Sequence, residues 1–79
     1  MAQSYNRRTK KMLISEYWSD DKTKKAEVHK YDGNFHVDYY EHDDLIQTEK
    51  YLNKSQSWAE AAAENYTMGI KVIQNGKRR

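Results

Sequence analysis

The chain has 79 residues, of which 37% are hydrophobic and 33% charged, and it contains neither cysteine nor proline. This length suits one domain with a thin core, and the lack of cysteine excludes disulfides and thiolate metal sites as its source of stability. No segment has the length and apolar character of a membrane span or a signal-peptide core, so we expect a soluble, cytoplasmic protein without a membrane partner.

Basic residues are concentrated at the two ends of the chain. Arg7, Arg8, Lys10 and Lys11 precede the first apolar run, and three more close the chain over 77–79. The segment between them holds seven basic and twelve acidic residues, a net charge of −5. We therefore expect a basic disordered arm over residues 1–10, one folded domain over 11–75 and a basic tail over 76–79.

The first predicted element is a strand from Met12 to Trp18, because this run is rich in β-branched and aromatic residues. One of its two aliphatic residues, Leu13 or Ile14, is expected in the core. A loop over 19–25 follows, since it begins with turn-forming residues and ends with basic ones.

The strongest local signal is the Asp32-Gly33 pair, which lies between two runs of alternating residues over 26–31 and 34–41. A two-residue loop of this composition favours a type I′ turn, which needs positive φ at both positions. It predicts a hairpin that places Val28 opposite Val37 and His29 opposite His36. Turn chemistry and hydrophobic pattern select the same register.

A fourth strand is expected from Leu45 to Leu52, after a turn over His42-Asp43-Asp44. Its register stays open between two alternatives. In one, the core-facing residues are Ile46, Thr48 and Leu52; in the other, a shift of one residue selects Leu45 and Tyr51.

A helix is predicted from Ser57 to Ile73. Ser57 and Glu60 have the spacing of a capping box, and apolar residues then recur at three- and four-residue steps. Gly69 falls inside this helix, where it costs about 1 kcal/mol relative to alanine.

These elements predict an α+β fold, an antiparallel meander of three to four strands with one C-terminal helix packed on one face. The expected core contains, besides Leu13 or Ile14, the residues Val28, Phe35, Val37, Tyr39, Ile46, Ala62, Tyr66 and Ile70. So small a core favours self-association, and we expect a homodimer.

No nucleophile elbow, phosphate loop or helical histidine pair occurs in the chain, so we expect no enzyme and no cofactor. The only candidates for a metal site are His29 and His36, which the hairpin sets opposite each other beside Glu27 and Asp38. Histidines on an open sheet face are more often hydrated surface, and we predict no metal.

Ten aromatic residues in so polar a chain cannot all be core, and the hairpin register places Tyr31 and Tyr40 on the sheet face away from Val28 and Val37. Such a face suits a protein partner or self-assembly. The alternative is single-stranded nucleic acid, with bases stacked on the tyrosines and phosphates bound by basic residues. The candidate binding residues are Tyr31, Tyr40, Lys25, Lys24, Arg7 and Arg8.

The segment Ser57–Lys71, together with a tyrosine-rich hairpin and the opening Leu13–Trp18, resembles small uncharacterised proteins of tailed marine cyanophages. The resemblance implies phage origin, the cytoplasm of an infected host cell and a host or phage protein as partner, and it supplies no site residues. The layout alone is similar to the single-stranded-DNA-binding coactivator fold, which works as a dimer with its strands facing the nucleic acid.

Overall fold

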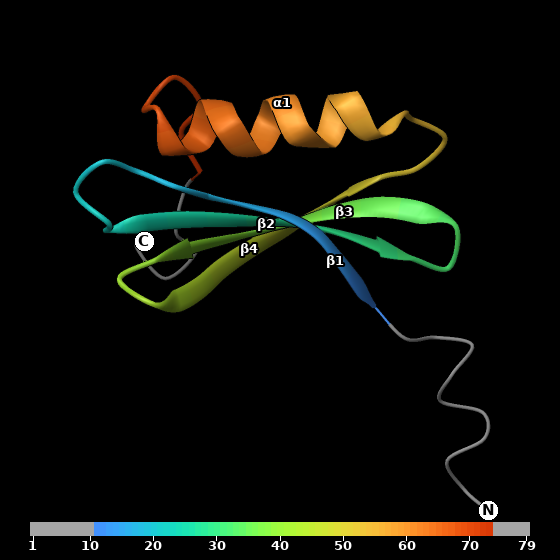
Figure 1. Cartoon of the computed structure of the whole chain (residues 1–79), viewed down its shortest axis with the longest axis horizontal. Coiled ribbons are helices and arrows are strands. Elements are labelled where there is room, and N and C mark those ends of the chain that lie inside the picture. The colour runs from blue at the N-terminus through green and yellow to red at the C-terminus, as the bar shows by residue number, and fades with distance from the viewer. Residues whose placement is uncertain (1–10, 74–79) are drawn as a thin grey trace, which may run out of the picture.

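The computed structural model describes residues 11–73, which form four strands and a helix in the order β1 (Met12–Trp18), β2 (Lys24–Tyr31), β3 (Asn34–Glu41), β4 (Asp44–Tyr51) and α1 (Gln56–Thr67). The strands pair antiparallel in sequence order, and α1 lies over one face of the twisted sheet (Figure 1). This confirms the α+β meander. The predicted arm over 1–10, the predicted tail over 76–79 and the end of the predicted domain lie outside the described residues.

The hairpin of β2 and β3 has the predicted register. Val28 pairs with Val37, and His29 pairs with His36. The backbone φ is +54° at Asp32 and +81° at Gly33, as a type I′ loop requires. β2 begins at Lys24, two residues before the predicted strand, because its first residues also pair with β3.

The β3–β4 loop is another two-residue turn, His42-Asp43, with positive φ at both residues, and Asp44 already belongs to β4. A bulge follows, since Tyr39 pairs with Gln47 and Tyr40 with Leu45, which leaves Ile46 without a partner.

This bulge changes the alternation within β4, so both predicted registers are wrong in part. Ile46 and Tyr51 both pack against the core, whereas Leu45 and Leu52 are exposed. Thr48 lies on the other face of the sheet, where its hydroxyl donates to a carboxylate of β3. A similar bulge at Ile14 in β1 turns that residue toward the core and leaves Leu13 exposed.

The helix ends earlier than predicted because Gly69 has a φ of +84° and terminates it. The Gly69 amide donates to the Tyr66 carbonyl and the Ile70 amide to the Asn65 carbonyl, which is the pattern of a Schellman motif. Ile70 is consequently 66% exposed, and its predicted place in the core is wrong.

The predicted capping box at Ser57 is also wrong. The N-cap residue is Ser55, without a side-chain capping bond, and its hydroxyl lies 2.9 Å from that of Ser57. Glu60 instead accepts hydrogen bonds from Gln56 in the helix and from Ser15 in β1. It therefore joins helix and sheet.

The core lies between α1 and strands β1 to β3. Its buried members include four predicted residues, Val28, Val37, Tyr39 and Tyr66, with the predicted Ala62 at its margin. Phe35 is half-buried against it. In the described part of the chain, no helix combines the length and apolar character that crossing a bilayer requires.

The segment after α1 covers the helix side of β4. Lys71 lies 3.4 Å from Glu49, and Ile73 packs against the core. Glu49 also accepts 2.6 Å hydrogen bonds from the hydroxyls of Tyr39 and Tyr51. The sheet face opposite α1 carries no further element from the described residues, and we call it the open face.

Candidate functional site

The open face is defined by the register of the sheet. Because Ala26 and Val28 point toward the helix, their neighbours in β2 point away from it, and cross-strand pairing extends this set over the sheet. Its members are Leu13, Glu16, Trp18, Lys25, Glu27, His29, Tyr31, His36, Asp38, Tyr40, Leu45, Thr48 and Lys50.

At its centre, one histidine lies between two carboxylates. His29 Nε2 is 3.0 Å from Glu27 Oε1 and 3.4 Å from Asp38 Oδ2. The exposed fraction is 12% for the His29 side chain, 17% for that of Glu27 and 3% for that of Asp38. They form a group whose ligand-type atoms all lie within 4.8 Å of one another. The predicted metal candidates were His29 and His36, but His36 does not belong to this group.

The remaining oxygen of each carboxylate is held by another side chain. Asp38 Oδ1 accepts a 2.7 Å hydrogen bond from the Thr48 hydroxyl, and Glu27 Oε2 lies 3.1 Å from Lys25 Nζ. Lys11 Nζ contacts Asp38 Oδ2 at 2.9 Å, on the same oxygen that faces His29. These residues are called the ionic cluster: Lys11, Lys25, Glu27, His29, Asp38 and Thr48.

The cluster keeps both carboxylates ionised. Burial alone would raise the pKa of Asp38, but hydrogen bonds from Lys11 and Thr48 lower that pKa below its usual value. Burial likewise opposes ionisation of Glu27, and hydrogen bonds from His29 and Lys25 lower its pKa overall. The negative charges of the cluster are therefore already balanced by lysine ammonium groups.

Lys25 is enclosed by aromatic rings as well as carboxylates. Its Nζ lies 4.4 Å from the ring centre of Tyr40 and 5.3 Å from that of Trp18, and Glu16 lies 3.9 Å away. The hydrogen bond to Glu27 is the main cause of its raised pKa. Tyr40 and Lys25 thus lie together as predicted, but the ring and the ammonium are in contact with each other.

Next to the cluster, His36 is buried beneath the edge of a tyrosine ring. The Tyr31 and His36 rings meet edge-on with centroids 5.5 Å apart. Burial lowers the pKa of His36, and the nearby charges of Lys50 and Lys11 lower it further. His36 is therefore held in its neutral form at the pH where an exposed histidine begins to take up a proton.

Large apolar side chains surround this polar centre. Leu13 is 52% exposed, Trp18 42% and Leu45 55%, and cross-strand pairing places all three on the open face. The sequence signal for the face was its tyrosines. Leu13 and Leu45 were missed because each lies beside a bulge that reverses the alternation.

Of the remaining predicted binding residues, Lys24 is the one that the structure describes, and it is not part of this face. Lys24 lies on the helix side, with its Nζ 5.7 Å from the ring centre of Tyr66. Arg7 and Arg8 lie outside the described residues. Lys11 was counted with the basic ends of the chain, and its contact with Asp38 has no signal in the sequence.

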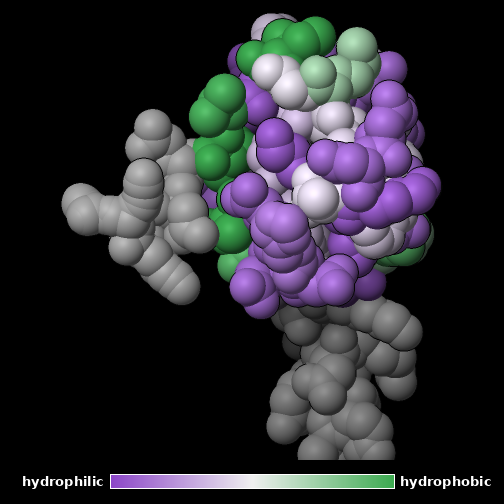
Figure 2. Space-filling view, turned by 90° about the vertical axis from the view of Figure 1, so that its left-hand side faces the viewer, coloured by the Kyte–Doolittle hydropathy of each residue, from purple (hydrophilic) through white to green (hydrophobic). Residues whose placement is uncertain are grey.

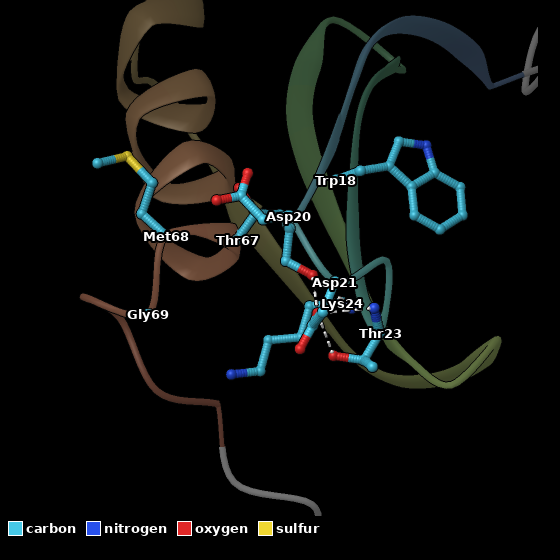
Figure 3. Close-up of a pocket in the computed structure, with 9 residues that line it drawn as sticks. Trp18, Asp20, Asp21, Thr23, Lys24, Thr67, Met68 and Gly69 are labelled. Atoms are coloured by element: carbon cyan, nitrogen blue, oxygen red, sulfur yellow. Dashed lines mark hydrogen bonds between the residues drawn. The ribbon is translucent and has the colours of Figure 1, made fainter.

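Lys24 also lines a pocket of about 450 Å³ between the β1–β2 turn and the end of α1. In Figure 3, Trp18 and Met68 at its border point away from each other, which leaves a rim of small polar groups. Asp21 stabilises the turn by accepting hydrogen bonds from the Thr23 amide and from the hydroxyls of Ser19 and Thr23, and these bonds lower its pKa to about 2. The pocket is a consequence of this turn and combines no groups of evident chemical use.

A second apolar surface follows the helix, where Met68, Ile70 and Val72 are exposed. Figure 2 views this end of the molecule and shows a largely hydrophilic surface, with hydrophobic side chains gathered at the top and along one side. This surface lacks the aromatic residues and the ordered polar contacts of the open face.

No family model, no curated protein and no solved structure matches the chain. The resemblances to cyanophage proteins and to the coactivator fold therefore stay predictions, as do the phage origin and the host-cell location.

Proposed function

We propose that the chain is a small non-catalytic protein-binding module whose open face associates with a second copy of itself. The observation that carries the proposal is the exposure of Leu13, Trp18 and Leu45 around a charge-paired centre. Interfaces are enriched in aromatic residues. Because the charges at the centre are already paired, a partner can cover them without burying an unpaired charge.

Charge and size both support a second copy as the occupant. The face carries the lysines Lys25 and Lys50 and the carboxylates Glu16, Glu27 and Asp38, and Lys11 adds a third ammonium through its contact with Asp38. Three positive and three negative charges allow the face to be complementary to itself about a two-fold axis. Four strands about 4.8 Å apart, of seven or eight residues at about 3.3 Å per residue, give a flat area of roughly 500 Å². Two such faces bury roughly 1,000 Å², typical of a weak and reversible dimer.

The same charges make single-stranded nucleic acid a less favourable partner. A phosphate that bound Lys25 or Lys11 would have to break an ion pair of 3.1 or 2.9 Å. The stacking face of Tyr40 is already covered by the Lys25 ammonium. Counterion release, the main source of nucleic-acid affinity, needs cations that are free to meet phosphates.

Sedimentation velocity tests the proposal. We expect the wild-type chain to pass from monomer to dimer between micromolar and millimolar concentration, and the variant Leu45→Lys to stay monomeric. Val72→Lys is the matched control, because Val72 is exposed but lies off the open face, and it should associate as the wild type does. A wild-type chain that is monomeric throughout, or equal behaviour of the two variants, would contradict the proposal.

A further inference from the structure

We infer that Glu27, His29 and Asp38 form a binding site for a divalent transition-metal ion such as Zn²⁺, for which the Lys11 ammonium competes. One imidazole and two carboxylates are a donor set that suits zinc, manganese or cobalt. All three donors come from the central strands β2 and β3, whose pairing fixes their spacing.

The distances agree with such a site. Zinc binds imidazole nitrogen and carboxylate oxygen at about 2.0–2.2 Å, so two ligands of one ion lie roughly 3.0–3.5 Å apart. His29 Nε2 lies 3.0 Å from Glu27 Oε1 and 3.4 Å from Asp38 Oδ2. Two edges of the ligand polyhedron thus exist before the ion binds, and all three ligand atoms lie within 4.8 Å of one another.

The orientation of both carboxylates is set by groups outside the triad. Thr48 holds the far oxygen of Asp38, and Lys25 holds that of Glu27. Each near oxygen is thereby directed toward His29. Supporting contacts of this kind orient metal ligands and raise affinity.

Of the described lysines, Lys11 is the one whose ammonium contacts a carboxylate oxygen that faces His29, Asp38 Oδ2. Its side chain is 45% exposed, so the ammonium can move into water when a metal ion takes its place. Lys25 need not move, because it binds the far oxygen of Glu27. Lys11 and an external cation therefore compete for the same oxygen of Asp38.

His29 can use Nε2 either to contact the two carboxylates or to bind a metal ion. Without a metal, the ionised carboxylates beside Nε2 favour a proton on that nitrogen, and Nδ1 is buried without a hydrogen-bond partner. Nε2 can give its lone pair to a metal ion once the proton is carried by Nδ1 instead. The missing partner behind Nδ1 also limits affinity, since outer contacts to a ligating histidine contribute about 10–100-fold. We expect binding in the micromolar range.

The test is titration of the full chain with Zn²⁺ by calorimetry and with Co²⁺ by visible absorption. Wild type should bind one ion, and His29→Gln should lose binding by about 100-fold or more. Lys11→Met should bind about tenfold tighter, because the competing ammonium is gone. Metal ions that bound nonspecifically to surface histidines would not bind more tightly to Lys11→Met.

Two matched controls complete the test. His36→Gln removes the facing histidine outside the triad and should bind as wild type does. Lys50→Met removes the same charge from the same face without touching a triad atom, so its affinity should rise much less than that of Lys11→Met. Circular dichroism establishes that each variant is folded.

The inference is overturned if wild type and His29→Gln bind alike or not at all, or if Lys11→Met gains no more than Lys50→Met. Because dimerisation is measured without metal, a failure of this site leaves the proposed self-association standing, and the reverse also holds.

Discussion

The hydroxyl of Tyr66 donates a 2.9 Å hydrogen bond to the main-chain carbonyl of Tyr40, and its ring packs edge-on against Tyr39 with centroids 4.9 Å apart. One helical residue thereby joins α1 to β3, one of the two central strands of the sheet. Burial raises the pKa of Tyr66 to about 12, so the hydroxyl stays a donor over the whole neutral range.

Tyr66→Phe should lower the free energy of unfolding by about 1 kcal/mol, since it removes one buried hydrogen bond and keeps the ring. Urea denaturation measures this loss. Tyr31→Phe is the control, because the Tyr31 hydroxyl forms no hydrogen bond with any residue over 11–73, and this variant should stay within about 0.5 kcal/mol of wild type. Equal stability of Tyr66→Phe and wild type would mean that the bond to Tyr40 contributes nothing.

Gly69→Ala should destabilise the domain by about 1–2 kcal/mol, because a residue with a Cβ is strained at a φ of +84°. No atom lies within 4 Å of the added Cβ, so the loss reports the backbone alone. A glycine inside a helix would give the opposite sign. Thermal unfolding of the variant therefore decides where the helix ends, and a raised melting temperature would place Gly69 within it.

How well the sequence predicts this fold depends on whether two local signals agree. At the β2–β3 hairpin, the Asp32-Gly33 turn and the alternation select one register, and that register is correct. In β4 the alternation was the only guide, and one unpaired residue, Ile46, reversed it. Bulges carry no marker in a single sequence.

The end of the helix is a second feature that the sequence alone does not predict correctly. Ile70 and Ile73 fit the helical spacing, and Ile73 does pack on the core, but it arrives there after the Schellman turn at Gly69. A glycine is compatible with both a helix interior and a helix end, and only the backbone φ distinguishes them.

The candidate site could be predicted only in part. The register brought Glu27 opposite Asp38 and placed His29 beside them. The diagonal contact between His29 and Asp38 depends on side-chain rotamers, and the contact of Lys11 depends on the path of the chain before β1. Neither is set by strand alternation.

Acid should weaken the domain through His36. Its folded-state pKa is lowered by burial, so the unfolded chain binds the proton more tightly than the native one. The contribution of neutral His36 is present above the unfolded pKa of about 6.5 and is lost as the pH falls through that value toward the lower native one. His36→Gln should remove this part of the slope.

Urea denaturation at a series of pH values between neutral and mildly acidic measures the effect. His42→Asn is the control, because His42 lies in an exposed turn with positive φ that asparagine also tolerates. If wild type and His36→Gln lose stability in parallel, His36 is not held neutral by the fold.

Binding of single-stranded oligonucleotides should not depend on Lys25. Its ammonium is committed to Glu27 and Tyr40, so Lys25→Met should leave both the affinity and its salt dependence unchanged. A labelled oligonucleotide titrated at two salt concentrations tests this. A slope reduced by about one phosphate contact in the variant would restore the nucleic-acid interpretation of the open face.

Self-association through the open face is tested most directly by NMR spectra recorded over a dilution series. The predicted result is that signals of Leu13, Trp18 and Leu45 shift together with concentration, while those of Trp58 and Val72, which are exposed elsewhere, stay constant. The contradicting result is a set of shifts confined to the surface of Met68, Ile70 and Val72, or spectra that do not change with concentration.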